Sequence, residues 1–110
     1  MQAFELSQLT PKFQREKHFY QEFLRPPSGT MSVGVYTLAA GATDPQLPHA
    51  EDEVYYVASG RGQIQVAGED RPVQAGSIIF VKAGEDHRFH SIAEDLTLLV
   101  FFAPAEGTSP

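Results

Sequence analysis

The sequence predicts a single all-β domain, folded as a closed barrel or as a jelly roll of two sheets. The chain has 110 residues, which is the size of one domain. Nine Gly and eight Pro divide it into short segments, and most segments after residue 29 have the alternating or β-branched composition of strands. About eight strands with short connections are typical of a barrel or a jelly roll.

The composition argues against several classes of protein. Fourteen Asp and Glu against eight Lys and Arg give a net charge of -6, which argues against binding to nucleic acid and to anionic membranes. The longest apolar run, residues 98–103, is far shorter than the about 20 residues of a membrane helix. The first residues lack the pattern of a signal peptide and the chain has no cysteine, so we expect a cytoplasmic protein without thiolate metal ligands.

Several segments have the pattern of strands. They are residues 30–39, 53–58, 63–67, 77–82, 87–92 and 96–103, and a tight turn leads into a short extended piece at 72–74. The last segment is apolar on both faces, which predicts a strand covered on both sides, by the core or by another subunit. We expect one domain over residues 1–110, with a barrel core at about 30–103, an N-terminal arm at 1–29 and a flexible tail at 104–110.

Two structures are open for the N-terminal arm. Residues 10–24 contain no Gly, Thr10–Pro11 resembles an N-cap followed by a first-turn proline, and Pro26–Pro27 would end a helix there. Part of the same stretch could instead be an edge strand that packs Phe19 and Phe23 against the barrel. The arm is therefore expected to contain a helical segment or an edge strand.

Two gapped motifs surround His49 and His87. The first runs through Gly41, Leu47, His49, Glu53 and Gly60, and the second through Gly76, Lys82, Gly84, His87 and Ser91. The spacings between these positions match those of the two sequence motifs of the cupin superfamily. The chain resembles that superfamily over about residues 34–102, and the joint match of two gapped motifs is far more specific than either motif alone.

The resemblance implies a small jelly-roll barrel of cupin type with a metal site inside it. His49, Glu53 and His87 match metal-ligand positions of the family. Leu47 stands where the family has a further histidine ligand, so water or substrate would complete the coordination shell. Gln46 or Glu51 is expected to reach the metal as an auxiliary ligand. The family also implies association into a homodimer.

An alternative alignment and two further departures stay open. His49 could be read as the first motif histidine with Glu51 in place of the second, but this breaks the spacing after Gly41 and shortens the gap to the glutamate. Lys82 replaces a proline of the second motif, and Ser91 replaces an asparagine.

The donor set suggests a definite metal chemistry. Two neutral imidazoles and one carboxylate leave open positions and suit Fe(II), and also Mn, Ni, Co or Zn. We therefore expect one divalent transition-metal ion as cofactor. An open site of this kind can activate a bound water or polarise an oxygen of a chelating substrate.

The alternation of side chains along the strands predicts which residues surround the metal. With Glu53 inward, Tyr55 and Val57 point inward as well, and an inward His87 is followed by inward Phe89 and Ser91. Arg88 and His90 then point away. We expect Leu47, Tyr55 and Phe89 to line an apolar cavity, with the Tyr55 hydroxyl as one polar group for a small-molecule ligand.

The favoured function is a metal-dependent, dioxygenase-like enzyme that acts on a small organic molecule, with Tyr55 or Glu51 handling a proton. The alternative is a non-catalytic module that binds a small ligand or a metal. A third hypothesis has no metal, with the histidines and glutamate hydrogen-bonded to one another, and Leu47 is the residue that supports it.

Overall fold

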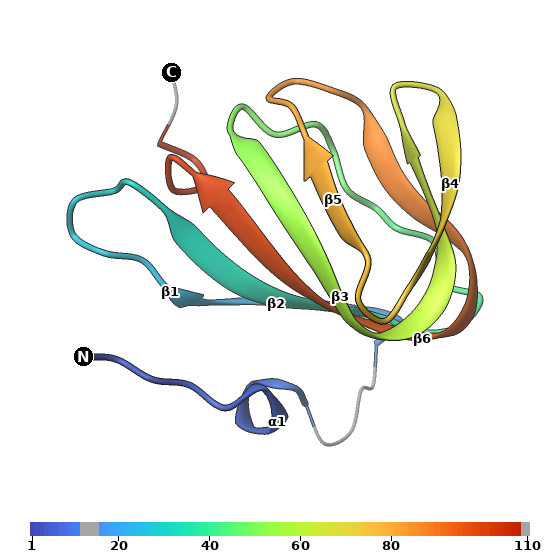
Figure 1. The fold of residues 1–110 in the computed structure, drawn as a ribbon, viewed down its shortest axis with the longest axis horizontal. Coiled ribbons are helices and arrows are strands. Elements are labelled where there is room, and N and C mark those ends of the chain that lie inside the picture. Colours follow the sequence, from blue (N-terminus) through green and yellow to red (C-terminus); the bar gives the residue numbers. More distant parts are fainter. Residues whose placement is uncertain (12–15, 109–110) are drawn as a thin grey trace.

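A computed structural model describes residues 1–11 and 16–108 and confirms the all-β prediction. The elements are α1 (Leu6–Leu9), β1 (His18–Leu24), β2 (Ser32–Leu38), β3 (Asp52–Val66), β4 (Glu69–Gln74), β5 (Ile78–Val81) and β6 (His87–Ala103). The strands form an antiparallel sheet in the order β1-β2-β6-β3-β4, with β5 paired to β3, and the sheet curls into a small jelly-roll barrel (Figure 1). No helix in the described part of the chain is long and apolar enough to cross a membrane.

The long strands β3 and β6 form the frame of the barrel. They pair antiparallel from Asp52 opposite Ala103 to Val66 opposite His87, with irregularities between Val57 and Gln63. The sequence predicted two separate strands within each of them. The strands continue instead because bulges bend the pair without ending it. Each therefore contributes to both halves of the barrel.

One bulge changes the predicted orientation of Ser91. His87 and Phe89 are buried and Arg88 is exposed, as the alternation predicts. Ser91 has a φ of 49°, however, which shifts the alternation by one residue. Ser91 is exposed and Ile92 is buried, so the prediction of an inward Ser91 is wrong.

The N-terminal arm contains the edge strand rather than the helix over residues 10–24. β1 pairs with β2 in register, with His18 opposite Leu38 and Tyr20 opposite Tyr36. The backbone groups of β1 hydrogen-bond to the edge of β2. These bonds favour a strand over the helix that the local sequence pattern suggested. A single helical turn, α1, precedes it, and residues 12–15 lie outside the described residues.

The barrel is filled by side chains that alternate inward along β2, β3 and β6. Fully burying a large apolar side chain contributes about 1.5–3 kcal/mol, so this cluster is the main source of stability. Its members on these three strands include Tyr36, Leu38, Tyr55, Val57, Ile64, Phe89, Leu96, Leu98, Val100 and Phe102. On the opposite face of β6, Leu99 and Phe101 are half-buried, so the strand is only partly covered on that side.

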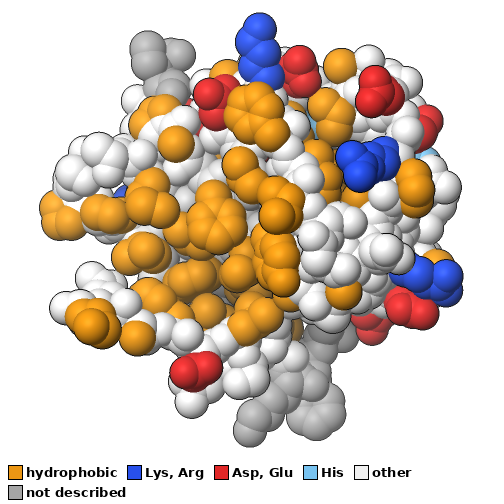
Figure 2. All heavy atoms as spheres, in the orientation of Figure 1, with side chains coloured by type: hydrophobic (Ala, Val, Ile, Leu, Met, Phe, Trp, Pro, Cys, Tyr) orange, Lys and Arg blue, Asp and Glu red, His pale blue; other side chains and the backbone are white. Residues whose placement is uncertain are grey.

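The outer face over β2, β6, β3 and β5 is strongly apolar (Figure 2). Exposed Tyr56, Ile78 and Phe80 lie on it, and Tyr56 is the cross-strand partner of Ile78. The half-buried Leu99 and Phe101 lie on the same face. Large apolar patches on a protein surface commonly mark an interaction site.

The segment after β6 returns to the mouth of the barrel. The Ala105 amide donates to the Gly29 carbonyl at 3.0 Å, and the Glu106 amide donates to Ser32 Oγ at 2.9 Å. The Gly107 amide donates to Glu51 Oε1 at 3.2 Å. These bonds fix the position of Glu106 beside β2.

Candidate metal centre

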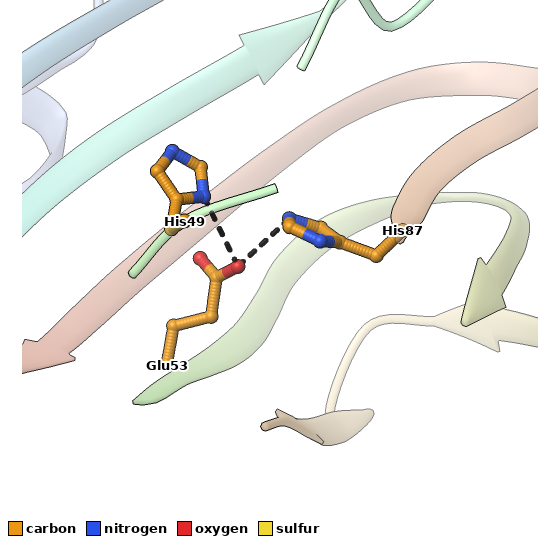
Figure 3. A group of neighbouring side chains, drawn as sticks. All are labelled: His49, Glu53 and His87. Carbon is orange, nitrogen blue, oxygen red and sulfur yellow. Dashed lines mark ion pairs between the residues drawn. The ribbon is translucent and has the colours of Figure 1, made fainter. Parts of the chain in front are cut away.

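His49, Glu53 and His87 come together inside the barrel (Figure 3). His49 lies in the loop before β3, Glu53 near the start of β3 and His87 at the first position of β6. One donor atom of each lies within 4.8 Å of the donor atoms of the other two. Glu53 Oε1 is 2.7 Å from His87 Nε2 and 3.5 Å from His49 Nδ1. The structure thus assembles the three residues that the sequence predicted as ligands.

The burial of this group fits a bound cation. The side chains of Glu53 and His87 are each 1% exposed, and that of His49 is 21% exposed. His49 Nδ1, His87 Nε2 and both carboxylate oxygens of Glu53 are buried and make no hydrogen bond with any described residue, despite their close approach. A buried polar atom without a partner costs about 1–3 kcal/mol, and one metal ion would satisfy several of these atoms at once.

The tautomer of His87 also suits a metal ligand. Its Nδ1 lies 2.9 Å from the Glu85 carbonyl oxygen, which can only accept, so Nδ1 carries the hydrogen. In the neutral ring, Nε2 then directs a lone pair at Glu53. This contact is favourable only when a proton or a metal lies between the two groups. Such a backbone bond to the other ring nitrogen is common among metal-binding histidines.

The pKa values of the group reflect this pairing. Burial by itself would lower the pKa of His87, but the close carboxylate of Glu53 and the hydrogen bond to the Glu85 carbonyl outweigh it and raise the pKa. The proximity of Glu53 likewise raises the pKa of His49. For Glu53, burial acts to raise the pKa, and the two imidazoles together lower it below its usual range. The group therefore favours a carboxylate beside cationic partners.

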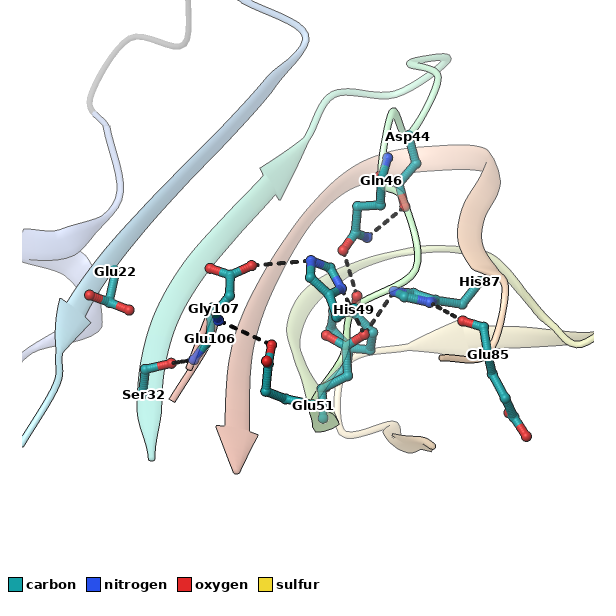
Figure 4. A network of polar contacts seen from close by, with 12 residues as sticks. Glu22, Ser32, Asp44, Gln46, His49, Glu51, Glu85, His87, Glu106 and Gly107 are labelled. Carbon is teal, nitrogen blue, oxygen red and sulfur yellow. Dashed lines mark hydrogen bonds and ion pairs between the residues drawn. The ribbon is translucent and has the colours of Figure 1, made fainter. Parts of the chain in front are cut away.

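His49 contacts a second carboxylate, which the sequence did not predict. Its Nε2 lies 3.1 Å from Glu106 Oε2 (Figure 4). Its ring packs edge-on against Phe102, with centroids 4.9 Å apart. Glu106 follows the last strand and belongs to neither motif. Burial, followed by the carboxylates of Glu22, Glu51 and Glu53, raises its pKa, and His49 opposes this effect.

Tyr55 is fully buried beside the group, as the alternation predicted. Its ring centroid lies 6.0 Å from that of His87, and its hydroxyl donates to Gln46 Oε1 at 2.7 Å. Gln46 in turn donates to Asp44 Oδ2 at 2.8 Å. Burial raises the pKa of Tyr55 well above its usual value. Tyr55 and Gln46 therefore hold each other in place in this structure.

Asp44 is a hub of the wall that carries these residues, and no motif pointed to it. Its carboxylate accepts from the Tyr36 hydroxyl at 2.6 Å and from the Phe89 amide at 2.9 Å. This ties the loop before β3 to β2 and β6. The loop is thereby held where it can present His49.

The remaining predicted residues lie apart from the three donors. Glu51 is buried and accepts from the Gly107 amide, which links the loop to the segment after β6. Leu47 is 77% exposed, so the expectation that it lines an apolar cavity is wrong. The side chain of Gln46 points inward, where it bonds to Tyr55 and Asp44, and the side chain of Leu47 therefore points outward.

A cavity of about 220 Å³ opens beside His49. Its walls include Tyr20, Tyr36 and Phe102, and its polar groups include His18, Gln46 and Glu106. Tyr20 and His18 come from β1 and were not predicted as site residues. No spacing rule could have found them, because β1 reaches the site only by pairing with the edge of β2.

The fold and the buried donor group define a class of protein, the single-domain jelly-roll barrels with a candidate mononuclear metal centre. Comparison with models of protein families identifies the family of the chain. Residues 34–102 match the model of the cupin domain, and the chain belongs to the cupin superfamily.

Individual proteins resemble the chain over most of its length. An uncharacterized protein of Streptomyces coelicolor is 49% identical over 107 residues, covering 97% of this chain and 100% of the relative. A crystal structure from Thermus thermophilus has a TM-score of 0.81 at 25% identity, covering 96% of this chain and 99% of the other. A predicted oxalate decarboxylase from Thermotoga maritima has a TM-score of 0.69 at 23% identity, covering 79% and 80%, which shows a shared fold.

Proposed function

We propose that this cupin binds one divalent transition-metal ion through His49, Glu53 and His87 and is a dioxygenase-like enzyme acting on a small organic molecule. The observation that carries the proposal is the set of buried donor atoms on these residues that approach one another closely but have no hydrogen-bond partner among the described residues. Two imidazoles and one carboxylate that leave coordination positions free suit Fe(II), and also Mn, Co, Ni or Zn. When bound, the metal would supply a Lewis acid that can polarise an oxygen of the substrate.

The chain's own residues would bind and orient the substrate. Tyr36 and Phe102 form apolar walls that exclude water from the side of His49. Glu106 lines the same cavity and can hold or release a proton at its carboxylate. Tyr55 would position Gln46, and Glu51 would hold the segment that carries Glu106.

The alternative is a non-catalytic module that binds a small ligand or a metal. The observation that favours it is the internal bonding of the polar groups nearest the donors. The hydroxyl of Tyr36 bonds to Asp44 and that of Tyr55 to Gln46, so each of these phenols already donates its hydrogen to a protein group rather than to a ligand. A binding module needs no proton transfer and would tolerate this arrangement.

Elemental analysis of the purified protein tests the proposal, with His87→Ala as the ligand variant. His90→Ala is a matched control, because His90 is half-buried on the outer side and pairs with Asp70. We expect near one equivalent of metal in the wild type and in His90→Ala, and its loss in His87→Ala. Absence of metal after loading with several divalent ions would overturn the proposal.

The bound metal then separates the two functions. With Fe(II) bound, oxygen uptake with a candidate substrate would support the dioxygenase-like reaction. If the candidate compounds bind but none is turned over, the result would favour the non-catalytic binding module.

We also propose that two copies associate through the apolar outer face of β3, β5 and β6. The proposal is supported by the exposure of Ile78 and Phe80, which are 69% and 61% exposed on one continuous face (Figure 2). Isolated exposed apolar residues are common, but a contiguous patch of this kind is rare on a monomer.

A further inference from the structure

We propose that the ligand of the cavity beside His49 is a small organic cation, an amine or a quaternary ammonium compound, held by aromatic rings and by Glu106. This inference rests on the proposed function, since it names the class of substrate for the same site. Three independent features of the cavity carry it: its walls, its charged group and its size.

The walls contain aromatic rings from three strands. Tyr20 on β1, Tyr36 on β2 and Phe102 on β6 line the cavity. The rings of Tyr20 and Tyr36 meet edge to face, with centroids 6.1 Å apart. A cation over the face of Tyr or Phe gains about 0.5–2 kcal/mol, more as it is withdrawn from water.

Gly34 allows Tyr20 to adopt this position. A Cβ atom at residue 34 would overlap the hydroxyl end of the Tyr20 ring. The ring therefore lies over the backbone of β2, where any other residue would displace it. The sequence of β2 thus leaves room for an aromatic wall at this point.

The charged group of the cavity is a carboxylate in a fixed position. The Glu106 amide is bound to Ser32 Oγ, and the Arg25 guanidinium donates to the Glu106 carbonyl oxygen at 2.7 Å. These bonds hold the backbone, so the side chain extends toward His49 (Figure 4). A fixed carboxylate beside aromatic rings is complementary to an ammonium group.

The surroundings of the cavity add negative potential. The chain has a net charge of -6, and Glu106 is the carboxylate among the described residues that line the cavity. Among the described residues that line the cavity, none is Lys or Arg. Arg25 is engaged by Glu22 in an ion pair of 2.8 Å. A cationic ligand would complement the carboxylate of Glu106, and an anionic ligand would be repelled by it.

The size limits the ligand to a small molecule. The cavity volume of about 220 Å³ is below the about 300–1,000 Å³ of pockets for drug-sized ligands. A trimethylammonium compound with a short polar tail has the appropriate size. The tail could then extend toward His49.

Titration calorimetry with choline tests the charge directly, because 3,3-dimethyl-1-butanol is its uncharged carbon analogue of the same shape. We expect choline to bind at least about tenfold more tightly than the analogue, and acetate and oxalate to bind more weakly than choline. Equal binding of the analogue, tighter binding of either anion, or no binding of choline would overturn the inference.

Variants locate the binding site. Glu106→Gln keeps the shape of the side chain and should weaken choline about tenfold while leaving the neutral analogue unchanged. Tyr20→Leu should weaken choline as well. Glu94→Gln is the matched control, since Glu94 pairs with Arg61 and does not line the cavity. Unchanged choline affinity in Glu106→Gln, with the fold intact by circular dichroism, would overturn the assignment.

The same titrations on metal-free and zinc-loaded protein separate the two proposals. If the protein binds metal and choline does not bind, the inference fails and the proposed function stands. If choline binds and elemental analysis finds no metal, the ligand class stands and the proposed metal-dependent function fails.

Discussion

Glu53 places a carboxylate that is 1% exposed between two imidazoles, and its pairing with His87 is closer than its pairing with His49. Removing one partner of a buried ion pair leaves the other without compensation. The effect of a substitution here therefore extends beyond metal binding to the stability of the metal-free protein.

We expect Glu53→Ala to lower the free energy of unfolding of the metal-free protein by about 3 kcal/mol, because His87 loses its buried partner. Urea denaturation measures this. Glu94→Ala is the control, since Glu94 and Arg61 are both 60% exposed and such surface pairs contribute little. Equal stability of the two variants would contradict a structural role for the buried pair.

Part of the site could be predicted from single residues. His49, Glu53 and His87 occur at motif spacings, and the alternation of β3 and β6 turned Tyr55 and Phe89 inward. Glu106 could not be predicted, because its approach to His49 depends on the return of the chain after β6. The orientation of Leu47 depends on the bonds that Gln46 makes, which no local pattern reveals.

At the scale of elements, the bends of β3 and β6 decide the shape of the barrel. Gly60 lies within β3 with a φ of 96°, and a Cβ atom there would overlap the carbonyl oxygen of Asp95 in β6. Gly68 has a similar φ of 83°, but open space surrounds it. A side chain at either position would strain the backbone, because both have a positive φ. Only at Gly60 would it also clash with the neighbouring strand.

We therefore expect Gly60→Ala to destabilise the protein by at least about 2 kcal/mol more than Gly68→Ala, because only the first separates β3 from β6. Thermal and urea unfolding of the two variants measure the difference. A similar loss in both variants would show that the close approach of the strands at Gly60 is not required.

The same bends explain what the sequence could not predict about the elements. Glycines and polar residues between segments 53–58 and 63–67 looked like the end of one strand and the start of another. A bulge has the same local composition as a turn, and only the pairing with a partner strand distinguishes them. The structure of the N-terminal arm could not be predicted for a related reason. β1 forms a strand because it pairs with the edge of β2, and the residues of β1 do not reveal this pairing.

For the whole molecule, the metal and the fold should be linked. The three donors come from a loop and from two strands that pair with each other, so an ion bound to all of them stabilises the folded state alone. Zinc at about a hundredfold above its dissociation constant should add about 2.7 kcal/mol, or roughly 10 °C in the melting temperature.

A thermal melt with zinc and then with a chelator measures this. The gain should reverse with the chelator, be absent in His87→Ala and remain in His90→Ala. A gain that persists in His87→Ala would place zinc at another site.

The apolar outer face predicts a second property of the whole molecule. Phe80→Lys should shift the protein from dimer to monomer in sedimentation velocity, because it places a charge within the patch. Leu47→Lys removes an apolar residue outside β3, β5 and β6 that is 77% exposed, against 61% for Phe80, and should leave the dimer intact. A wild-type protein that sediments as a monomer would refute the interface.

The position of Glu106 beyond the last strand has a consequence for how such barrels diversify. A substitution there changes the charge of the cavity without altering any strand, the apolar core or the three metal donors. The charge of the cavity can then change without a change in the residues that form the core. A lineage built on this barrel could exchange a cationic ligand for a neutral or anionic one through a substitution at this position, while selection for stability acts on the strands.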